Sequence, residues 1–460
     1  MTIISVMADF VTGTSFGSLA SQTIGTGKLH LLDTLGAMSA GSRTIEGAAI
    51  GKLTAGLSSR GNVPVTGYPI EVSLPTAVMA SCAATRCTEI DDIHLESCTT
   101  PGSVIVPTAL ALAYAGYLAD PHDFLAALTV GYELLIRMGL AVDGPNALSR
   151  GIWPTYLAAP LGSAAVTAKA LKLDKKKTAD ALACALTMST GGAGRIRKPL
   201  SSRWLTLGLA AQNGVVAAFS AAAGFAGDDA LLDREASGPL LALIAAKAKL
   251  SDGLGEKLLM NETCLKPYPI ARQALSAVEA FQETLAAHEI APESIEKVTI
   301  FVPGQFTKMI DNPKPPENRM ESIIGIQYQI ALAAFEPARL RDVGRELLLQ
   351  DSRIDVMMAK VSVKPSLELE AYFPQTWPAR VEVTTKNGVM VREVLYPKGD
   401  GHNPFTWNEV ALKFQQAAFG KVRDTREEPI TGLIASIDTA ESMHPLLESL
   451  KTLYIRQEEQ

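Results

Sequence analysis

The sequence contains few of the residues that bind metals and redox cofactors. Its six histidines are far apart in 460 residues and form no HxxxH or HExxH pair, which excludes the usual zinc motifs. Its five cysteines form no CxxC pair and no group of three that would hold an iron–sulfur cluster. The odd cysteine count is typical of free thiols in a reducing compartment. We therefore expect a cytoplasmic protein that needs no metal and no cofactor.

Signatures of nucleotide, nucleic-acid and membrane binding are also missing. No GxxxxGKS or GxxxxGKT phosphate loop occurs, the formal net charge is −6, and the first residues do not form a signal peptide. The most apolar stretches are Ser103–Gly116, interrupted by Pro107, and Leu205–Gly227, interrupted by polar residues. We predict that both are helices buried on all sides, and that the protein binds neither nucleic acid nor a membrane.

The spacing of apolar residues predicts a largely helical chain. Its length, with 47% hydrophobic and 20% charged residues, is typical of a globular protein with two domains. From Asp9 to about Glu262, apolar residues recur every three or four positions and strand patterns are almost absent. Helices are predicted there at Leu31–Ala40, Thr108–Leu118, His122–Gly139, Ala158–Leu171, Lys177–Met188 and Trp204–Ala223.

A mixed α/β pattern follows Cys264. Ile270–His288 is predicted to be an amphipathic helix, and Asn387-Gly388 is a strong hairpin signal. Strands are predicted at Lys297–Val302, Ala359–Pro365, Arg380–Thr385 and Val389–Leu395, with helices at Ser322–Phe335 and Asp342–Leu349. Helical patterns return at Trp407–Phe419, Pro429–Ser436 and Met443–Arg456.

These patterns predict a mainly α fold class with an inserted α+β domain. Both ends of the chain, residues 1–265 and 403–460, are expected to form one large all-helical domain. Residues 266–402 are expected to form a smaller α/β lid domain between them in sequence.

The strongest signal for a binding site is a basic segment that follows a glycine-rich turn at residues 191–194. This segment is Arg195-Ile196-Arg197-Lys198, and Arg203 comes shortly after it. No acidic residue occurs between Asp180 and Asp228, so these cations lack the acidic neighbours of an ordinary solvated face. We predict that they hold a small organic anion. The alternative is a surface patch or ion pairs at a domain interface.

Two further segments carry candidate site residues. In residues 89–94, Glu-Ile-Asp-Asp-Ile-His, a carboxylate and the imidazole of His94 at a helix end would make an acid/base pair. The alternative is that Asp91 or Asp92 caps a helix or neutralises arginines. The second segment, Lys266-Pro267-Tyr268-Pro269 with Arg272 a turn later, lies at the predicted domain junction, where ligand clefts are common.

Together these segments resemble the MmgE/PrpD family, which includes 2-methylcitrate dehydratases, cis-aconitate decarboxylases and iminodisuccinate epimerases. The resemblance extends nearly end to end, from residues 32–36, Leu-Asp-Thr-Leu-Gly, to Tyr328. It implies a large helical domain, a smaller α/β lid, a cleft between them and a homodimer. It also implies that Lys198 is the active-site lysine, that Tyr328 is the active-site tyrosine and that Asp91 lies in the acidic motif.

The chain departs from the family at three positions where dehydratases and decarboxylases typically carry histidine. Thr100, Trp153 and Leu275 stand there instead. The loss of these histidines argues against elimination of water, which needs a proton donor for the departing hydroxyl. The chain therefore resembles iminodisuccinate epimerase most, and we expect an epimerase of a small polycarboxylate.

Such an epimerase removes an α-proton, stabilises an enediolate and returns a proton to the other face. Lys198 is the expected base, because neighbouring arginines lower its pKa. The group that serves the opposite face stays open among Tyr328, Tyr268, Tyr156 and His94, and Asp91 is a further catalytic candidate. The predicted substrate-binding residues are Arg195, Arg197, Arg203 and Arg272 as carboxylate clamps, with Lys266, Tyr268, Thr100 and Trp153. The alternative for Trp153 is core packing.

Two other functions stay open from the sequence. One is a decarboxylase or dehydratase of a cis-aconitate or 2-methylcitrate type of acid, with a rearranged acid/base set. The other is a non-catalytic anion-binding protein that kept the fold and lost the histidines. Release of CO₂ or formation of a conjugated alkene distinguishes the first from an epimerase, and any turnover excludes the second.

Overall fold

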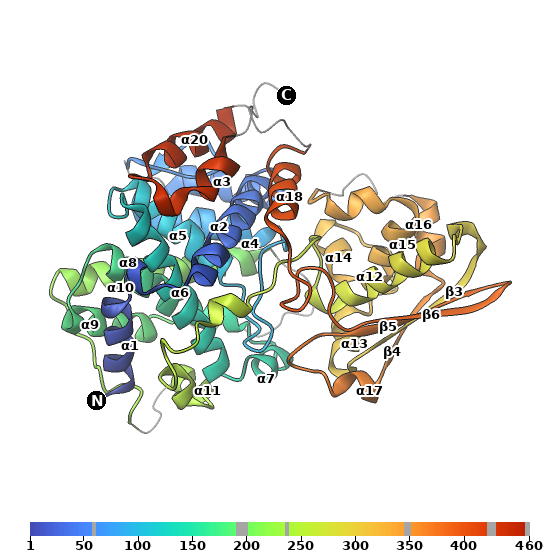
Figure 1. The fold of residues 1–460 in the computed structure, drawn as a ribbon, viewed down its shortest axis with the longest axis horizontal. Helices are drawn as coiled ribbons and strands as arrows, with labels where there is room; N and C mark the ends of the chain where they lie inside the picture. The colour runs from blue at the N-terminus through green and yellow to red at the C-terminus, as the bar shows by residue number, and fades with distance from the viewer. Residues whose placement is uncertain (58–60, 190–200, 235–238, 345–350, 421–428, 456–460) are drawn as a thin grey trace. The chain divides into compact units, whose positions relative to one another are not determined.

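A computed structural model describes residues 1–57, 61–189, 201–234, 239–344, 351–420 and 429–455 (Figure 1). The chain divides into two compact units, a helical unit of Met1–Thr263 with Trp407–Gln460, and an α/β unit of Cys264–Thr406. The limits predicted from the sequence are 265/266 and 402/403. The mainly helical fold class with a small α/β part is confirmed.

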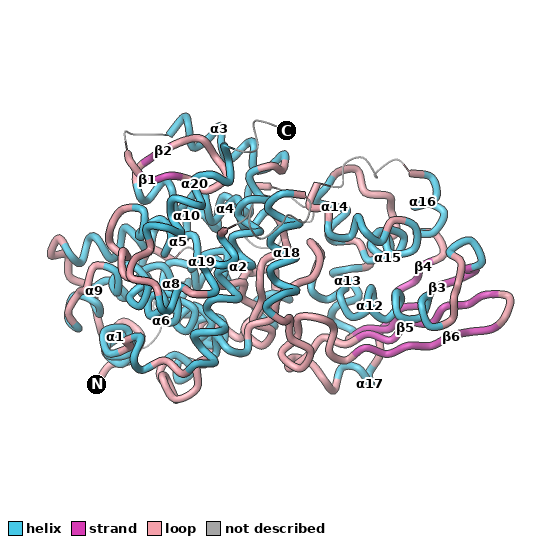
Figure 2. The backbone as a smooth tube through the Cα atoms, turned by 45° about the horizontal axis from the view of Figure 1, so that its top comes forward, coloured by secondary structure: helices cyan, strands magenta, loops and turns pink. Residues whose placement is uncertain are grey.

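The helical unit is built from long, mostly buried helices. Its main helices are α1 (Ile3–Gly13), α2 (Ser21–Ser42), α3 (Ile45–Leu57), α4 (Leu74–Cys87), α5 (Gly102–Tyr114), α6 (Pro121–Ala141), α7 (Gly144–Ser149), α8 (Pro154–Ala170), α9 (Lys175–Thr187), α10 (Ser202–Ala222), α11 (Pro239–Leu243), α18 (Trp407–Phe419), α19 (Ile430–Ala435) and α20 (His444–Ile455). A short ribbon of β1 (Val63–Pro64) and β2 (Glu71–Val72), which the sequence did not predict, also belongs to this unit (Figure 2).

Small residues let the central helices of this unit pack closely. α8 packs against α6 and α10, and α10 also packs against α4. A Cβ atom on Gly131 of α6 would lie 2.4 Å from the Val166 side chain, and one on Gly214 of α10 would lie 2.2 Å from the Pro160 carbonyl oxygen. Both separations are shorter than van der Waals contact, so these helix crossings require glycine.

Two helix predictions in this unit are wrong in detail. Pro107 does not interrupt its segment, because α5 continues through it and nearly every residue of that helix is buried. Tertiary packing there outweighs the hydrogen bond that proline removes. α10 is not buried on all sides, since Leu209 is 45% exposed.

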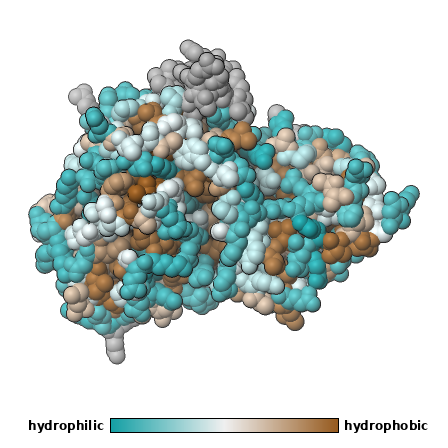
Figure 3. Space-filling model, in the orientation of Figure 1, coloured by the Kyte–Doolittle hydropathy of each residue, from teal (hydrophilic) through white to brown (hydrophobic). Residues whose placement is uncertain are grey.

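Among the described residues, α6 and α10 are long and apolar enough to cross a membrane by length and composition. The apolar window of α6 is 94% buried inside the protein, as expected for a core helix, and that of α10 is 50% buried. On the face shown in Figure 3, hydrophobic residues of the helical unit alternate with hydrophilic ones. Two such helices are weak evidence for a membrane span.

The α/β unit is built on a four-stranded sheet with the strand order β4-β3-β5-β6 (Figure 2). Its strands are β3 (Ile295–Val302), β4 (Val361–Pro365), β5 (Ala379–Thr385) and β6 (Gly388–Val394). β3 runs parallel to β4 and antiparallel to β5, and the Asn387-Gly388 turn joins β5 to β6. All four predicted strands and the hairpin are confirmed.

Helices flank the strands of this unit in sequence. They are α12 (Arg272–Ala287), α13 (Gly304–Ile310), α14 (Arg319–Ile324), α15 (Ile326–Phe335), α16 (Ser352–Met358) and α17 (Leu367–Glu370). α12 packs on β5, β6 and α15. The helix predicted at Ser322–Phe335 is two helices, because Gly325 adopts an extended conformation between them. Of the helix predicted at Asp342–Leu349, residues 342–344 are not helical and the rest lie outside the described residues, while α16 was not predicted.

A buried ion pair on α6 fixes the segment that follows α11. Arg137 Nε donates to Glu133 Oε1 at 2.7 Å, and the Arg137 guanidinium also donates to backbone carbonyls within residues 249–253. Glu133 Oε2 accepts the backbone N–H of Leu259 at 2.8 Å. This segment therefore depends on both charges.

The variant Arg137→Met should lower the free energy of unfolding by about 3–5 kcal/mol, because it leaves the buried Glu133 carboxylate without its cation. Urea denaturation measures this change. Lys172→Met is the control, since Lys172 forms an exposed pair with Asp123 and its removal should change stability little. Similar losses in both variants would contradict the assignment.

Candidate functional site

The predicted site residues divide between the two units. The basic segment with Arg195, Arg197 and Lys198 lies outside the described residues. The helical unit contains Asp91, His94, Thr100, Trp153 and Arg203, and the α/β unit contains Lys266, Tyr268, Arg272 and Tyr328.

An acidic loop follows α4, and its first carboxylates contact an arginine at the end of that helix. Arg86 Nη1 lies 2.6 Å from Glu89 Oε2 and 3.3 Å from Asp91 Oδ1. Burial by itself lowers the pKa of Arg86, but the charges of Asp91 and Glu89 outweigh burial and raise that pKa above its ordinary value. Asp91 thus neutralises an arginine, which is the alternative that the sequence left open.

Arg203, in the first turn of α10, is held by the same loop. Its guanidinium pairs with Glu89 and lies 4.9 Å from the ring centre of Trp153 and 5.2 Å from that of Trp204. Trp153 therefore contacts a charged side chain and is not simply a core residue. We call Arg86, Glu89, Asp91 and Arg203 the arginine–carboxylate cluster.

The arginine–carboxylate cluster is balanced, with two positive and two negative formal charges. Tyr156 lies beside it on α8, and its ring stacks on Trp153 with 6.1 Å between ring centres. Burial raises the pKa of Tyr156, and the positive charges of Arg203 and Arg86 act in the opposite direction. Arg203 is thus paired with Glu89, while its Nε has no hydrogen-bond partner among the described residues, and its role as a carboxylate clamp stays a prediction.

His94 does not pair with Asp91, which corrects the predicted acid/base arrangement. The loop is not a helix end here, because His94 bridges to Thr99 and donates its backbone N–H to the Thr99 carbonyl at 2.8 Å. His94 Nδ1 lies 3.0 Å from Ser97 Oγ and accepts the backbone N–H of Ser97 at 3.3 Å, and its Nε2 lies 4.0 Å from Glu262 Oε2. Burial lowers the pKa of His94 to about 4.

Two of the three positions that lack the expected histidine, Thr100 and Trp153, belong to the helical unit. The backbone N–H of Thr100 donates to Thr155 Oγ1 at 3.0 Å, and Thr155 is two residues after Trp153. The third position, Leu275, belongs to the other unit, where it lies on α12 and is 1% exposed. The segment that contains Thr100 is thus hydrogen-bonded to the first turn of α8, which Trp153 directly precedes.

Asp92 is turned away from the arginine–carboxylate cluster and is completely buried. Its Oδ2 lies 2.8 Å from His30 Nδ1 and accepts the Tyr132 hydroxyl at 2.8 Å. Its Oδ1 accepts the backbone N–H of Gly102, the first residue of α5, at 2.8 Å. Adjacent aspartates therefore have different surroundings.

In the α/β unit, Arg272 begins α12 and is 3% exposed. Its Nη2 donates to Asp400 Oδ2 at 3.0 Å, and its guanidinium lies 5.9 Å from the ring centre of Trp377. Nη1 has no hydrogen-bond partner among the described residues. Arg272 therefore keeps one buried donor for an acceptor such as a carboxylate.

The other candidates of this unit are buried or half-buried. Lys266 is 2% exposed, and the N–H of its neighbour Leu265 donates to Gly399 in the turn that carries Asp400. The Tyr268 hydroxyl donates to Gln282 Oε1 at 3.1 Å, and burial raises the pKa of Tyr268. Tyr328 on α15 is 1% exposed.

Comparison with known proteins agrees with these features. The MmgE/PrpD N-terminal domain matches residues 5–249, and the MmgE/PrpD C-terminal domain matches residues 268–439. The chain belongs to the MmgE/PrpD family. Its relatives include cis-aconitate decarboxylases of Homo sapiens, 25% identical over 98% of this chain and 95% of the relative, and of Aspergillus terreus, 24% identical over 94% and 92%. The relatives are thus enzymes, and they do not support the closer resemblance to iminodisuccinate epimerase.

Three residues that contact the predicted site residues of this MmgE/PrpD chain were not predicted from its sequence. Arg86 was not a candidate, although it is the basic residue nearest before the acidic loop. Glu89 appeared only as part of the motif, and no signal marked it as the partner of two arginines. Asp400 is 128 residues from Arg272, a separation that no local pattern reveals.

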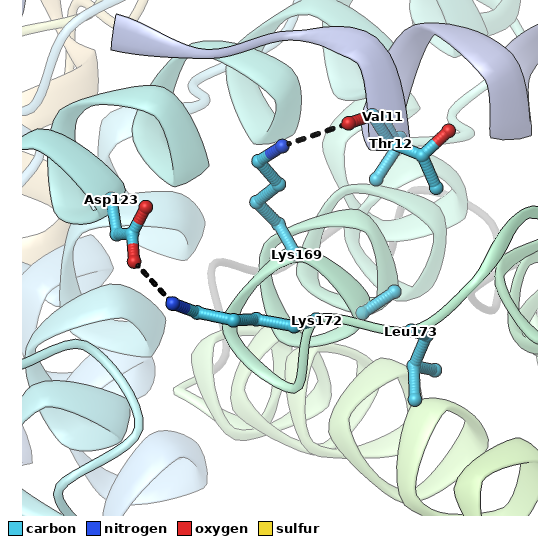
Figure 4. A pocket seen from close by; sticks show the side chains of 7 residues that line it. Val11, Thr12, Asp123, Lys169, Lys172 and Leu173 are labelled. Carbon is cyan, nitrogen blue, oxygen red and sulfur yellow. Dashed lines mark hydrogen bonds and ion pairs between the residues drawn. The ribbon is translucent and has the colours of Figure 1, made fainter.

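A cavity of about 230 Å³ in the helical unit does not coincide with these residues (Figure 4). Lys169 and Lys172 line it, but Lys169 Nζ donates to the Thr12 carbonyl at 3.2 Å and Lys172 pairs with Asp123 at 3.0 Å. Because both cations have protein partners, the cavity offers no obvious anion site.

The depressed pKa of His94 predicts acid sensitivity. Between pH 6.5 and about 4, the unfolded chain binds a proton at His94 that the folded chain does not, so the free energy of unfolding falls as the pH falls through this window. From pH 7.5 to 5 this histidine should account for about 2 kcal/mol of the loss. Urea denaturation of wild type and His94→Gln at both pH values measures it. An identical pH dependence in the two proteins would refute the assignment.

Proposed function

We propose that this protein is a cofactor-independent lyase that decarboxylates a small polycarboxylic acid of the cis-aconitate type. The main support is that the similarity to cis-aconitate decarboxylases covers 94–98% of the chain and includes both family domains. This reverses the order inferred from the sequence, where an epimerase came first and a decarboxylase or dehydratase was the alternative.

Decarboxylation sets two requirements for the protein. The bond between a carbon and its carboxylate breaks, and CO₂ leaves. The electron pair of that bond shifts across the neighbouring double bond, and a carbon atom of the remaining acid takes up a proton. The enzyme must therefore hold the remaining carboxylates by fixed positive charge and supply one proton. No redox step occurs, so no oxidant or reductant is needed.

The charges of the described residues support a division of these tasks. Because the arginine–carboxylate cluster is balanced, we assign carboxylate binding to residues outside it. These are Arg195, Arg197 and Lys198, together with Lys266 and the Nη1 group of Arg272. We assign proton donation to Lys198 or Tyr328. His94 suits that role poorly, because an imidazole with a pKa of about 4 is neutral near pH 7.

An epimerase is the second candidate, and the replaced histidines favour it. Thr100 and Trp153 stand where the family resemblance implies histidines, so two imidazoles that could exchange protons are missing. A reaction that only removes and returns an α-proton needs fewer such groups. A non-catalytic anion-binding protein remains the outcome if no acid is turned over.

Incubation of the purified protein with cis-aconitate in D₂O distinguishes these functions. We expect CO₂ release and a deuterated product, measured by gas analysis and NMR. The variant Lys198→Ala should lower turnover at least about 100-fold, since it removes a group that donates protons or holds the anion. The control Lys172→Met should leave turnover unchanged.

Other outcomes of this assay have defined meanings. Deuterium incorporation into a polycarboxylate of unchanged composition, without CO₂, would replace the decarboxylase with the epimerase. Binding of polycarboxylates with no turnover of any of them would show that the protein is not an enzyme.

We also propose the homodimer that the family resemblance implies. The exposed apolar residues Leu209 on α10 and Phe225 just after it are consistent with a covered surface. Light scattering coupled to size-exclusion chromatography should give twice the chain mass of 48.8 kDa. A mass of one chain at micromolar concentration would rule the dimer out.

A further inference from the structure

The backbone of the acidic loop is held by a lysine that is far away in sequence. Lys413, on α18, donates from Nζ to the carbonyl oxygen of Ile90 at 3.1 Å and also pairs with Asp33 on α2. All three residues are buried. Helix α18 packs along α2. Through Lys413 it therefore contacts the backbone of Ile90, the residue between Glu89 and Asp91 of the arginine–carboxylate cluster.

The loop conformation needs such support. Glu89 has a φ of +57°, in the left-handed region that is unfavourable for a residue with a side chain. Backbone strain of this kind persists only where the surroundings fix it. The Ile90 carbonyl that accepts from Lys413 lies one residue after Glu89. Two residues further on, Asp92 anchors the loop through His30, Tyr132 and Gly102.

We propose that Lys413 and Asp92 are positioning residues that set the direction of Glu89 and Asp91 toward Arg86. The expected effect on turnover rests on the proposed function, because Glu89 holds Arg203 against Trp153, one of the predicted substrate-binding residues. Neither residue contacts the arginine–carboxylate cluster through a described hydrogen bond. Their role is to fix the backbone on either side of Asp91, so that adjacent side chains turn to opposite sides.

The first test compares Lys413→Met with Arg43→Met. Arg43 is a matched control, because it also docks α18 and donates to the carbonyl oxygens of Ala417 and Ala418. Both variants should lower the melting temperature. Only Lys413→Met should accelerate hydrogen exchange of the amides in residues 88–102, by about 10-fold or more, and lower kcat for cis-aconitate by a similar factor while KM changes less than about threefold.

A milder pair covers the case in which Lys413→Met does not fold. Tyr132→Phe removes one hydroxyl from Asp92, and Tyr68→Phe removes one buried hydroxyl that donates to the Gly47 carbonyl at 2.9 Å. Tyr132→Phe should accelerate exchange at Gly102, whose N–H donates to Asp92, by about threefold or more. Tyr68→Phe should leave that amide unchanged.

Hydrogen exchange and turnover separate the two hypotheses. If wild type does not decarboxylate cis-aconitate but the exchange contrast holds, the proposed function fails and the positioning of the loop stands. If amide hydrogen exchange is equally fast in a variant and its control, the proposed positioning of the acidic loop is wrong. Normal kcat in an active Lys413→Met enzyme whose loop exchanges faster would overturn the effect of the loop on turnover.

Discussion

The buried carboxylate of Asp92 constrains much of the helical unit. A carboxylate out of reach of water is costly unless its oxygens are satisfied, and here the partners come from α2, α6 and the start of α5. The conformation of the acidic loop therefore depends on the packing of those helices against one another. In this conformation, the alternation of side chains along the chain directs Asp91 to Arg86, on the other side of the loop.

Charge balance distinguishes charged side chains that stabilise the fold from those that can bind a substrate. Arg203 looks like a surplus cation in the sequence, but it contacts Glu89, and Arg86 contacts both Glu89 and Asp91. Removing Glu89 would leave Arg203 without its carboxylate, and removing Asp91 would leave two arginines sharing one carboxylate, so these pairs belong to the fold. For this reason the proposed function assigns the positive charge that holds a polyanion to residues elsewhere in the chain.

Local sequence patterns predicted most elements and few of the site contacts. Apolar spacing placed helices and all four strands of the α/β unit, because those elements follow from residue periodicity. It misjudged Pro107, where packing outweighs a lost hydrogen bond, and Gly325, which divides two helices. Motifs located Asp91, His94 and Arg272. The partners of His94 and Arg272 could not be predicted, since Glu262 and Asp400 are brought near by tertiary folding across more than a hundred residues, and the same holds for Lys413 at the Ile90 carbonyl.

The replaced histidines change which groups can move a proton. An indole at position 153 offers a surface for the Arg203 guanidinium but no proton at neutral pH, and the Thr100 hydroxyl does not titrate there. The histidines that remain near the loop are engaged, His30 with Asp92 and His94 with Ser97. Burial also keeps His94 neutral above about pH 4. We infer that proton transfer in this chain relies on lysine or tyrosine, so its pH dependence should follow groups with higher ordinary pKa values than imidazole.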